Sequence, residues 1–244
     1  GNNGSRSSKV HGGAPPSCGE IVVLRPVDPS QDEVAYIQAM SRSQVVEAYS
    51  EWRTLSHSED MCLSYALESR GYGRLLDLGC GAGRIADHVA GKCEQYLGVD
   101  ASGEMIEAAS KIHPALQFKH QDILSFVGEE SSWDTILLMG NILDYLHPTS
   151  RRKSLLSLCL RWITDEGYLI GSNHLTHGSM ACGYYSEDYH GAHIHNYRAS
   201  FSEIATEVEG SGFTIAVMCR DYRYDTADWV YWVATPANRS LPTG

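Results

Sequence analysis

The sequence lacks the features of several large classes of protein. Its 244 residues include 19 Lys and Arg against 30 Asp and Glu, which gives a formal net charge of −11. Nucleic-acid binding depends on neutralising phosphates with a basic surface, so we predict no nucleic-acid partner. The chain has no run of 18 apolar residues and no apolar core of the signal-peptide type near its N-terminus. We therefore expect neither a membrane span nor an export signal.

The cysteines do not follow the patterns of disulfide or zinc proteins. All seven are scattered along the chain, their number is odd, and no Cys-x-x-Cys pair occurs. A disulfide framework and a cysteine-based zinc module are therefore disfavoured, and we expect a reduced, cytoplasmic chain. A length of 244 residues, 43% of them hydrophobic, suits a single buried core.

The strongest positive signal is a glycine-rich turn after an apolar run. Residues 75–83 read Leu-Leu-Asp-Leu-Gly-Cys-Gly-Ala-Gly, which predicts a buried strand that leads into a helix. Glycines at a helix N-terminus let backbone N–H groups approach a ligand closely. Residues 96–100, Tyr-Leu-Gly-Val-Asp, end in an acid 21 positions after Gly79. This spacing suits a carboxylate that accepts hydrogen bonds from ribose hydroxyls, so we predict an adenosine-containing cofactor.

The spacing of the glycines distinguishes two such cofactors. A dinucleotide site requires Gly-x-Gly-x-x-Gly, and Arg84 stands where the third glycine would fall. The acid-x-Gly-x-Gly-x-Gly pattern that begins at Asp77 instead resembles the first motif of class I S-adenosylmethionine-dependent methyltransferases. The resemblance extends over about residues 45–235. Four further motifs occur in the family's order, at residues 98–102, 121–123, 133–139 and 165–170.

The resemblance implies a fold, a cofactor and a set of binding residues. The implied fold is α/β, with a doubly wound, seven-stranded, mostly parallel sheet and a C-terminal antiparallel hairpin. The implied cofactor is S-adenosylmethionine, with S-adenosylhomocysteine as product. Asp100 and Ala101 would bind the ribose, and Asp122 and Ile123 the adenine. The other implied cofactor residues are Asp77, Gly79, Gly81, Gly83, Gly140, Asn141 and two lid aromatics, Tyr49 and Trp52. Tyr49 and Trp52 could equally be core residues, because their spacing also suits packing along a helix.

The expected organisation follows from these motifs and from local composition. Residues 1–19, rich in Gly, Ser, Asn and Pro, predict a disordered tail. A strap and lid helices would follow at 20–73, the cofactor-binding core at 74–236 and a second tail at 237–244. Residues 174–200 are long for a connection in a compact domain, which predicts a substrate lid.

Candidate catalytic residues follow the fourth and fifth predicted strands. Asp144 and Tyr145 lie in a loop that borders the transferring methyl group in the family. The predicted lid holds five of the eleven histidines. Histidine titrates near neutral pH and can remove a proton from an amine or hydroxyl, so we add His174 and His177 as candidates. The alternative for this segment is a metal site, which we do not predict, built from His190, His193, His195 and Asp188.

These patterns predict a small-molecule methyltransferase. It would transfer a methyl group to nitrogen or oxygen by in-line displacement, mainly by holding the reactants collinear in a dry site. One alternative is a non-catalytic cofactor-binding subunit with a regulatory role. Another is an NAD-dependent oxidoreductase, which Arg84 disfavours.

Overall fold

The computed structural model describes residues 33–177, 180–189, 192–223 and 226–237. The predicted N-terminal tail, part of the strap and His190 lie outside these ranges. Three helices come first: α1 (Glu33–Met40), α2 (Ser43–Glu51) and α3 (His57–Arg70). The start of α3 is fixed by a capping box, in which Ser56 Oγ accepts from Glu59 N and the Glu59 carboxylate accepts from Ser56 N.

Strands and helices then alternate along the chain, as expected of a parallel sheet with helical crossovers. The strands are β1 (Arg74–Leu78), β2 (Gln95–Asp100), β3 (Gln117–His120), β4 (Trp133–Leu138), β5 (Ile163–Leu175), β6 (Gly183–Tyr189), β7 (Ala192–Ala199), β8 (Phe213–Arg223) and β9 (Thr226–Pro236). The helices between them are α4 (Ala86–Val89), η1 (Ala90–Lys92), α5 (Gly103–Ile112), η2 (Ile142–Tyr145), α6 (Thr149–Trp162) and α7 (Phe201–Gly210).

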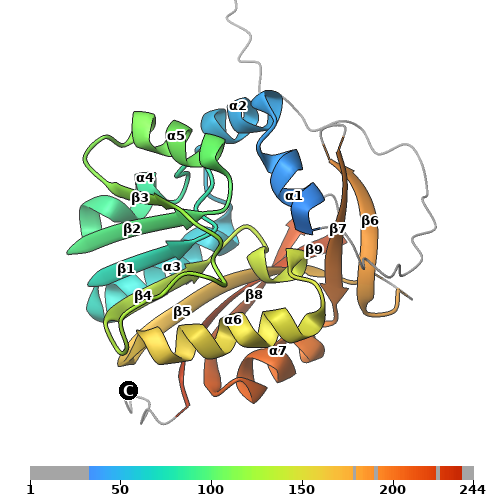
Figure 1. Cartoon of the computed structure of the whole chain (residues 1–244). Helices are drawn as coiled ribbons and strands as arrows, with labels where there is room; N and C mark the ends of the chain where they lie inside the picture. The colour runs from blue at the N-terminus through green and yellow to red at the C-terminus, as the bar shows by residue number, and fades with distance from the viewer. Residues whose placement is uncertain (1–32, 178–179, 190–191, 224–225, 238–244) are drawn as a thin grey trace, which may run out of the picture.

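The sheet order is β3-β2-β1-β4-β5-β7-β6, and β9 pairs with both β5 and β8 (Figure 1). Strands β1 to β5 pair in parallel, while β8 and β9 form the antiparallel hairpin expected at the C-terminus. The predicted fold class is therefore confirmed.

The sheet has nine strands where seven were expected, because residues 174–200 do not form an irregular loop. They contain β6 and β7, which pair with each other antiparallel, and β7 then pairs in parallel with the end of β5. Strand β6 contains three tyrosines and β7 contains one, and aromatic residues fit a pleated, half-buried surface well. The length of the segment was recognised correctly, but its β-structure was not.

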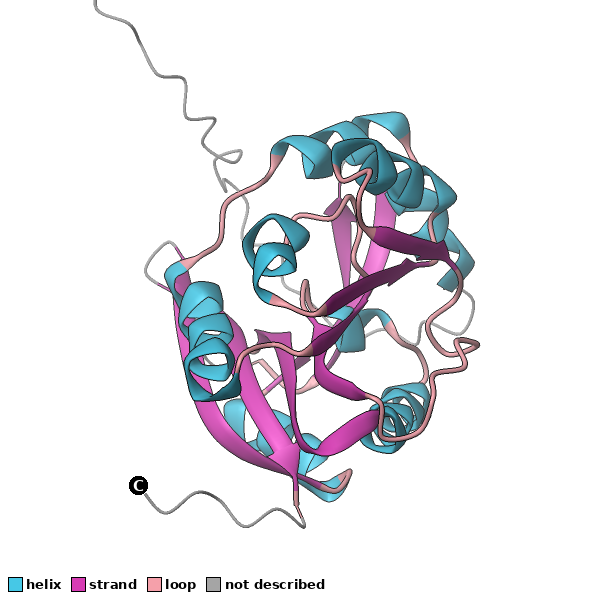
Figure 2. Ribbon diagram, turned by 90° about the vertical axis from the view of Figure 1, so that its left-hand side faces the viewer, coloured by secondary structure: helices cyan, strands magenta, loops and turns pink. Residues whose placement is uncertain are grey.

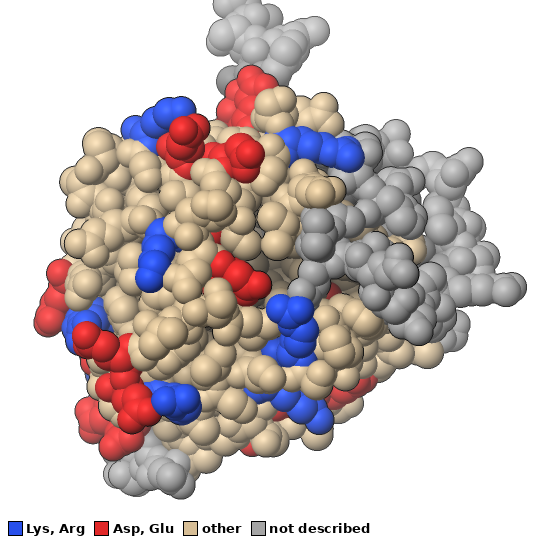
Figure 3. Space-filling model, viewed as in Figure 1, with Lys and Arg blue, Asp and Glu red and all other residues tan. Residues whose placement is uncertain are grey.

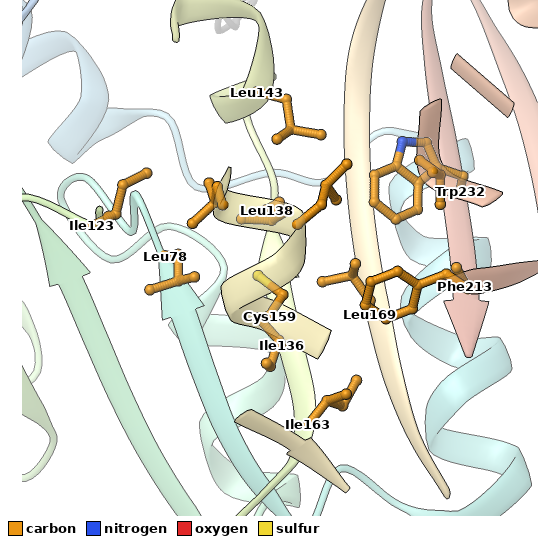
Figure 4. Packing of buried hydrophobic residues seen from close by; sticks show 14 of the residues in the cluster. Leu78, Ile123, Ile136, Leu138, Leu143, Cys159, Ile163, Leu169, Phe213 and Trp232 are labelled. Atoms are coloured by element: carbon orange, nitrogen blue, oxygen red, sulfur yellow. The ribbon is translucent and has the colours of Figure 1, made fainter. Parts of the chain in front are cut away.

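Helices cover both faces of the sheet (Figure 2), and each face has its own hydrophobic core. Helices α6 and α7 pack on one face against Leu138, Leu169 and Trp232, among the residues drawn in Figure 4. Helices α3 and α4 cover the other face, against Leu75 and Tyr231. The two cores fix the strands, so the loops at their carboxyl ends are held by a rigid frame.

The surface carries charges of both signs. On the face shown in Figure 3, the described Lys and Arg side chains are interspersed with Asp and Glu side chains. No helix in the described part of the chain is both long enough and apolar enough to cross a bilayer.

Candidate functional site

A cavity of about 920 Å³ opens where the carboxyl ends of β1, β2, β4 and β5 meet the helices α1 and α2. Doubly wound sheets place their ligands at this edge, outside the carboxyl ends of the strands. The volume lies within the range of about 300–1,000 Å³ that is usual for small-molecule sites. We describe the cavity in two halves, one beside β1 and β2 and the other beside the end of β5.

The glycine turn forms the floor of the first half. Gly79, Gly81 and Gly83 have φ angles of +76°, +52° and +75°, which disfavour any residue with a Cβ atom. A Cβ at Gly79 would also collide with the side chain of Ile142. The backbone N–H groups of Gly79 and Cys80 donate to Val99 O at 2.7 and 3.1 Å, which fastens the turn to β2.

Asp100 connects this turn to the end of β2. One carboxylate oxygen accepts from Gly81 N at 2.9 Å and the other from Ser102 N at 2.8 Å. Burial raises the pKa of Asp100, while the hydrogen bonds from Ser102 N and Gly81 N act in the opposite direction. Asp100 lines the cavity, so its position suits the predicted contact with a ribose.

Replacing Asp100 with alanine is expected to weaken S-adenosylhomocysteine binding by about 2 kcal/mol, because hydrogen bonds to a charged acceptor would be lost. Asp100→Asn should lose less, since one oxygen acceptor remains. Calorimetric titration measures both affinities. Unchanged affinity in Asp100→Ala would mean that this carboxylate does not contact the cofactor.

Asp77 lies one strand away and is almost completely buried. Its carboxylate accepts a hydrogen bond from the Tyr96 hydroxyl at 2.7 Å. Burial raises the pKa of Asp77 from its ordinary value of 3.8 to about 6, although the Tyr96 hydrogen bond and the nearby Arg84 guanidinium favour the charged form. A charged carboxylate at this depth is costly, and the cavity that it lines is where a cationic ligand group would offset that cost.

The raised pKa of Asp77 predicts a stability cost near neutral pH. Between pH 4 and pH 6 the folded state holds a proton that the unfolded state has released, so stability falls as pH rises through this window. Asp77→Asn keeps an acceptor for Tyr96 without the charge. It should be more stable than the wild type at pH 7, by at most about 3 kcal/mol. Urea denaturation at pH 4 and pH 7 tests this, and a difference independent of pH would contradict it.

The remaining predicted cofactor residues lie around the same half of the cavity. Asp122 lines it, accepts from Leu124 N at 2.7 Å and lies 3.9 Å from the Arg151 guanidinium. The other predicted residues in the wall are Ala101, Ile123, Gly140, Asn141, Gly79 and Gly81. Gly83 is not among the residues of the wall, and a Cβ there would meet the side chains of His113 and Ala109 instead.

Tyr49 and Trp52 line the cavity from the end of α2, with their rings 6.0 Å apart in a T-shaped arrangement. Tyr49 also packs against the small core cluster that contains Val45 and Met105. Tyr49 therefore lies both in the cavity wall and against a core cluster.

An ion pair between Arg84 and Glu59 connects α3 to the end of the glycine turn, and no sequence motif predicted it. Arg84 donates to both oxygens of Glu59, at 2.5 and 3.1 Å, and to Thr54 O at 3.0 Å. Its guanidinium stacks on Trp52 at 4.1 Å. Arg53 donates to the carbonyl oxygens at the end of the turn, Ala82 O and Gly83 O. The capping-box spacing of Ser56 and Glu59 was a signal for the helix start, but it carried no information about Arg84.

His174 lines the second half of the cavity, and the fully buried Asp144, which is not among the residues of the wall, is hydrogen-bonded to it. Asp144 Oδ2 accepts from His174 N at 2.6 Å and from His174 Nδ1 at 3.0 Å, while Oδ1 accepts from Asn173 Nδ2 at 2.6 Å. An Nδ1–H that donates to a carboxylate leaves Nε2 of the neutral ring as an acceptor. Nε2 lies 3.2 Å from Asn141 Nδ2, and both residues line the cavity. This is the arrangement of a general base held by a carboxylate.

The other two catalytic candidates differ in position. Tyr145 lines the cavity, with its ring 6.0 Å from the His174 ring. His177 is not among the described residues of the cavity wall; its Nε2 lies 3.4 Å from Arg198 Nη1. The described residues contain no group of three His, Cys, Asp or Glu side chains able to hold a metal ion, but His190 and the side chains of Asp188 and His193 lie outside the described part of the chain.

Comparisons with known proteins agree with this geometry. Residues 75–167 match a family described as "Methyltransferase domain". The Bacillus subtilis (strain 168) protein named "Putative methyltransferase YqeM" is 31% identical over 106 residues, which cover 42% of this chain and 42% of that protein. The matched part thus spans less than half the length of that relative.

Solved structures extend the likeness in fold. The 1,6-didemethyltoxoflavin-N1-methyltransferase of Burkholderia thailandensis, with bound 1,6-didemethyltoxoflavin and S-adenosylhomocysteine, has a TM-score of 0.67 at 19% identity, covering 90% of this chain and 99% of that one. A complex of DhpI with S-adenosylhomocysteine has a TM-score of 0.62 at 16% identity, covering 84% and 96%.

The fold of this chain is therefore similar to that of a solved Rossmann-like, S-adenosylmethionine-dependent methyltransferase. The match to the methyltransferase-domain family covers residues 75–167, less than half of the chain.

Proposed function

We propose that this protein transfers a methyl group from S-adenosylmethionine to a nitrogen or oxygen atom of a small molecule, with His174 as the general base. The observation that carries this proposal is that one cavity joins the glycine turn and Asp100 to the His174–Asp144 pair.

The residues of the first half of the cavity fit this cofactor. The left-handed glycines keep side chains away from the floor, and Asp100 stands at the end of β2, where a ribose would be bound. Asp77 is a buried carboxylate in the same wall, suited to a cationic amino group. When bound, S-adenosylmethionine supplies a methyl carbon that bonds to the acceptor atom as its bond to sulfur breaks, which leaves S-adenosylhomocysteine.

The residues of the second half would handle the acceptor and its proton. His174 Nε2 is placed to take the proton that the acceptor nitrogen or oxygen loses. Asp144, buried and hydrogen-bonded to Nδ1–H, holds the ring in the required tautomer and stabilises the imidazolium that forms. In this structure Nε2 of His174 accepts a hydrogen bond from Asn141 Nδ2. The acceptor would have to replace Asn141 as the partner of Nε2.

Calorimetric titration of the full chain with S-adenosylhomocysteine and with NAD, side by side, tests the proposal. We expect S-adenosylhomocysteine to bind at micromolar or lower concentration and NAD to bind much more weakly, because Arg84 occupies the position of the third dinucleotide glycine. Preferential binding of NAD, or the absence of S-adenosylhomocysteine binding, would overturn it.

A further inference from the structure

The second half of the cavity is walled by aromatic rings. Tyr36 and Tyr145 stack with their centroids 4.1 Å apart and their planes at 19°. The His174 ring stands edge-on to Tyr145 at 6.0 Å and 86°, and to Trp229 at 5.7 Å and 82°. All four line the cavity. We call these residues, with Arg198, the acceptor chamber.

Arg198 brings a positive charge to this chamber. It is half-buried, lines the cavity and lies in register with His174 across the β5–β7 pair. Among the described residues, Arg84 and Arg151 also line the cavity, but both lie outside the acceptor chamber. Arg84 follows the glycine turn and is bound to Glu59, and Arg151 lies 3.9 Å from Asp122 in the other half of the cavity. Arg198 itself belongs to the chamber, with its Nη1 3.4 Å from His177 Nε2.

We propose that the acceptor is a planar aromatic or heteroaromatic molecule that carries an anionic oxygen group, bound by Arg198 while its ring packs against Tyr145 and Trp229. This inference rests on the proposed function, because it names the substrate class of the same site.

Two physical arguments support this class. Flat rings pack against aromatic walls in offset or edge-to-face contact, which adds about 0.5–1.5 kcal/mol per pair beyond the area that is buried. The guanidinium is planar, always charged, and matches the geometry of a carboxylate or similar oxyanion with two parallel hydrogen bonds. Because Arg198 is in register with His174, a rigid ring bound through its anionic group would hold its reacting atom at a fixed position relative to the base.

Three probes separate the contribution of the planar ring from that of the negative charge. The first, 4-hydroxybenzoate, is planar and anionic, and the second, 4-hydroxybenzamide, is planar and neutral. The third, trans-4-hydroxycyclohexanecarboxylate, is anionic but not planar. The affinity of the full chain for S-adenosylhomocysteine is measured first by calorimetry, and each probe is then titrated into the saturated protein. We expect the benzoate to bind at least about tenfold more tightly than either of the others, because only it makes both kinds of contact.

Arg198→Met should remove the preference for the benzoate over the benzamide and leave S-adenosylhomocysteine affinity unchanged. Arg161→Met is the matched control, since Arg161 is an exposed arginine of α6 that pairs with Glu130; it should keep the preference. Equal affinities for the three probes, no binding of the benzoate, or a preference that survives Arg198→Met would each overturn the inference. Failure of S-adenosylhomocysteine itself to bind would instead overturn the proposed function, and this inference with it.

Discussion

His174→Ala is expected to lower kcat by about 10²- to 10⁴-fold, the range usual for loss of a general base, without changing the affinity for S-adenosylhomocysteine. The reason is that His174 lines the cavity, with Nδ1 held by Asp144 at 3.0 Å and Nε2 3.2 Å from Asn141 Nδ2, which belongs to another residue of the cavity wall. The loss should shrink at high pH, where the acceptor loses its proton unaided. A variant that merely disturbed packing would show no such recovery.

The measurement is steady-state release of S-adenosylhomocysteine across a range of pH, with an acceptor found by screening planar acids. His57→Ala is a control, because His57 is exposed at the start of α3. Asp144→Asn should also lower kcat, since an amide does not stabilise an imidazolium as a carboxylate does. If His177→Ala lost as much activity as His174→Ala, the base would be misassigned.

Glu59→Ala is expected to lower the free energy of unfolding by about 3–5 kcal/mol, the usual cost of breaking a buried ion pair by removing one partner. Glu59 is completely buried, and Arg84 is only 8% exposed. The variant leaves the Arg84 guanidinium inside the protein without its carboxylate, and it also removes one half of the capping box of α3.

Urea denaturation of the wild type and two controls measures this effect. Glu130→Ala breaks an exposed pair with Arg161 and should cost no more than about 1 kcal/mol. The double variant Glu59→Leu with Arg84→Met should recover much of the loss, because no unpaired charge remains buried. A Glu59→Ala variant as stable as Glu130→Ala would show that the Glu59–Arg84 ion pair does not stabilise the contact between α3 and the glycine turn.

The meeting of the glycine turn, Asp77 and Asp100 at one cavity could be predicted from the sequence because its determinants are local. The glycine turn and Asp77 lie within a few residues of one another, and Asp100 ends the next strand of the same parallel unit. Their spacing therefore fixes their geometry. By contrast, Asp144 and His174 were separate candidates 30 residues apart, and only the pairing of β4 with β5 places the loop after β4 beside the end of β5.

Other features of the site depend on contacts between residues far apart in the sequence, which the spacing within a motif does not predict. Arg84 was correctly recognised as a departure from the dinucleotide pattern, but its partner Glu59 lies on a helix before the first strand. Arg198 and Trp229 reach His174 through strand registers set by β7 and β9. These registers follow from the packing of the whole sheet.

The β6–β7 hairpin has a consequence for how the specificity of this protein can change. It is inserted between β5 and α7, and in the described part of the chain its register with β5 consists of two residue pairs, His174 with Arg198 and Leu175 with Ala199. The glycine turn and Asp100 belong to strands on the other side of β4. Exchange of this one insertion for another would thus alter the chemistry presented to the acceptor and leave the cofactor machinery intact, so the two halves of the site can diverge independently.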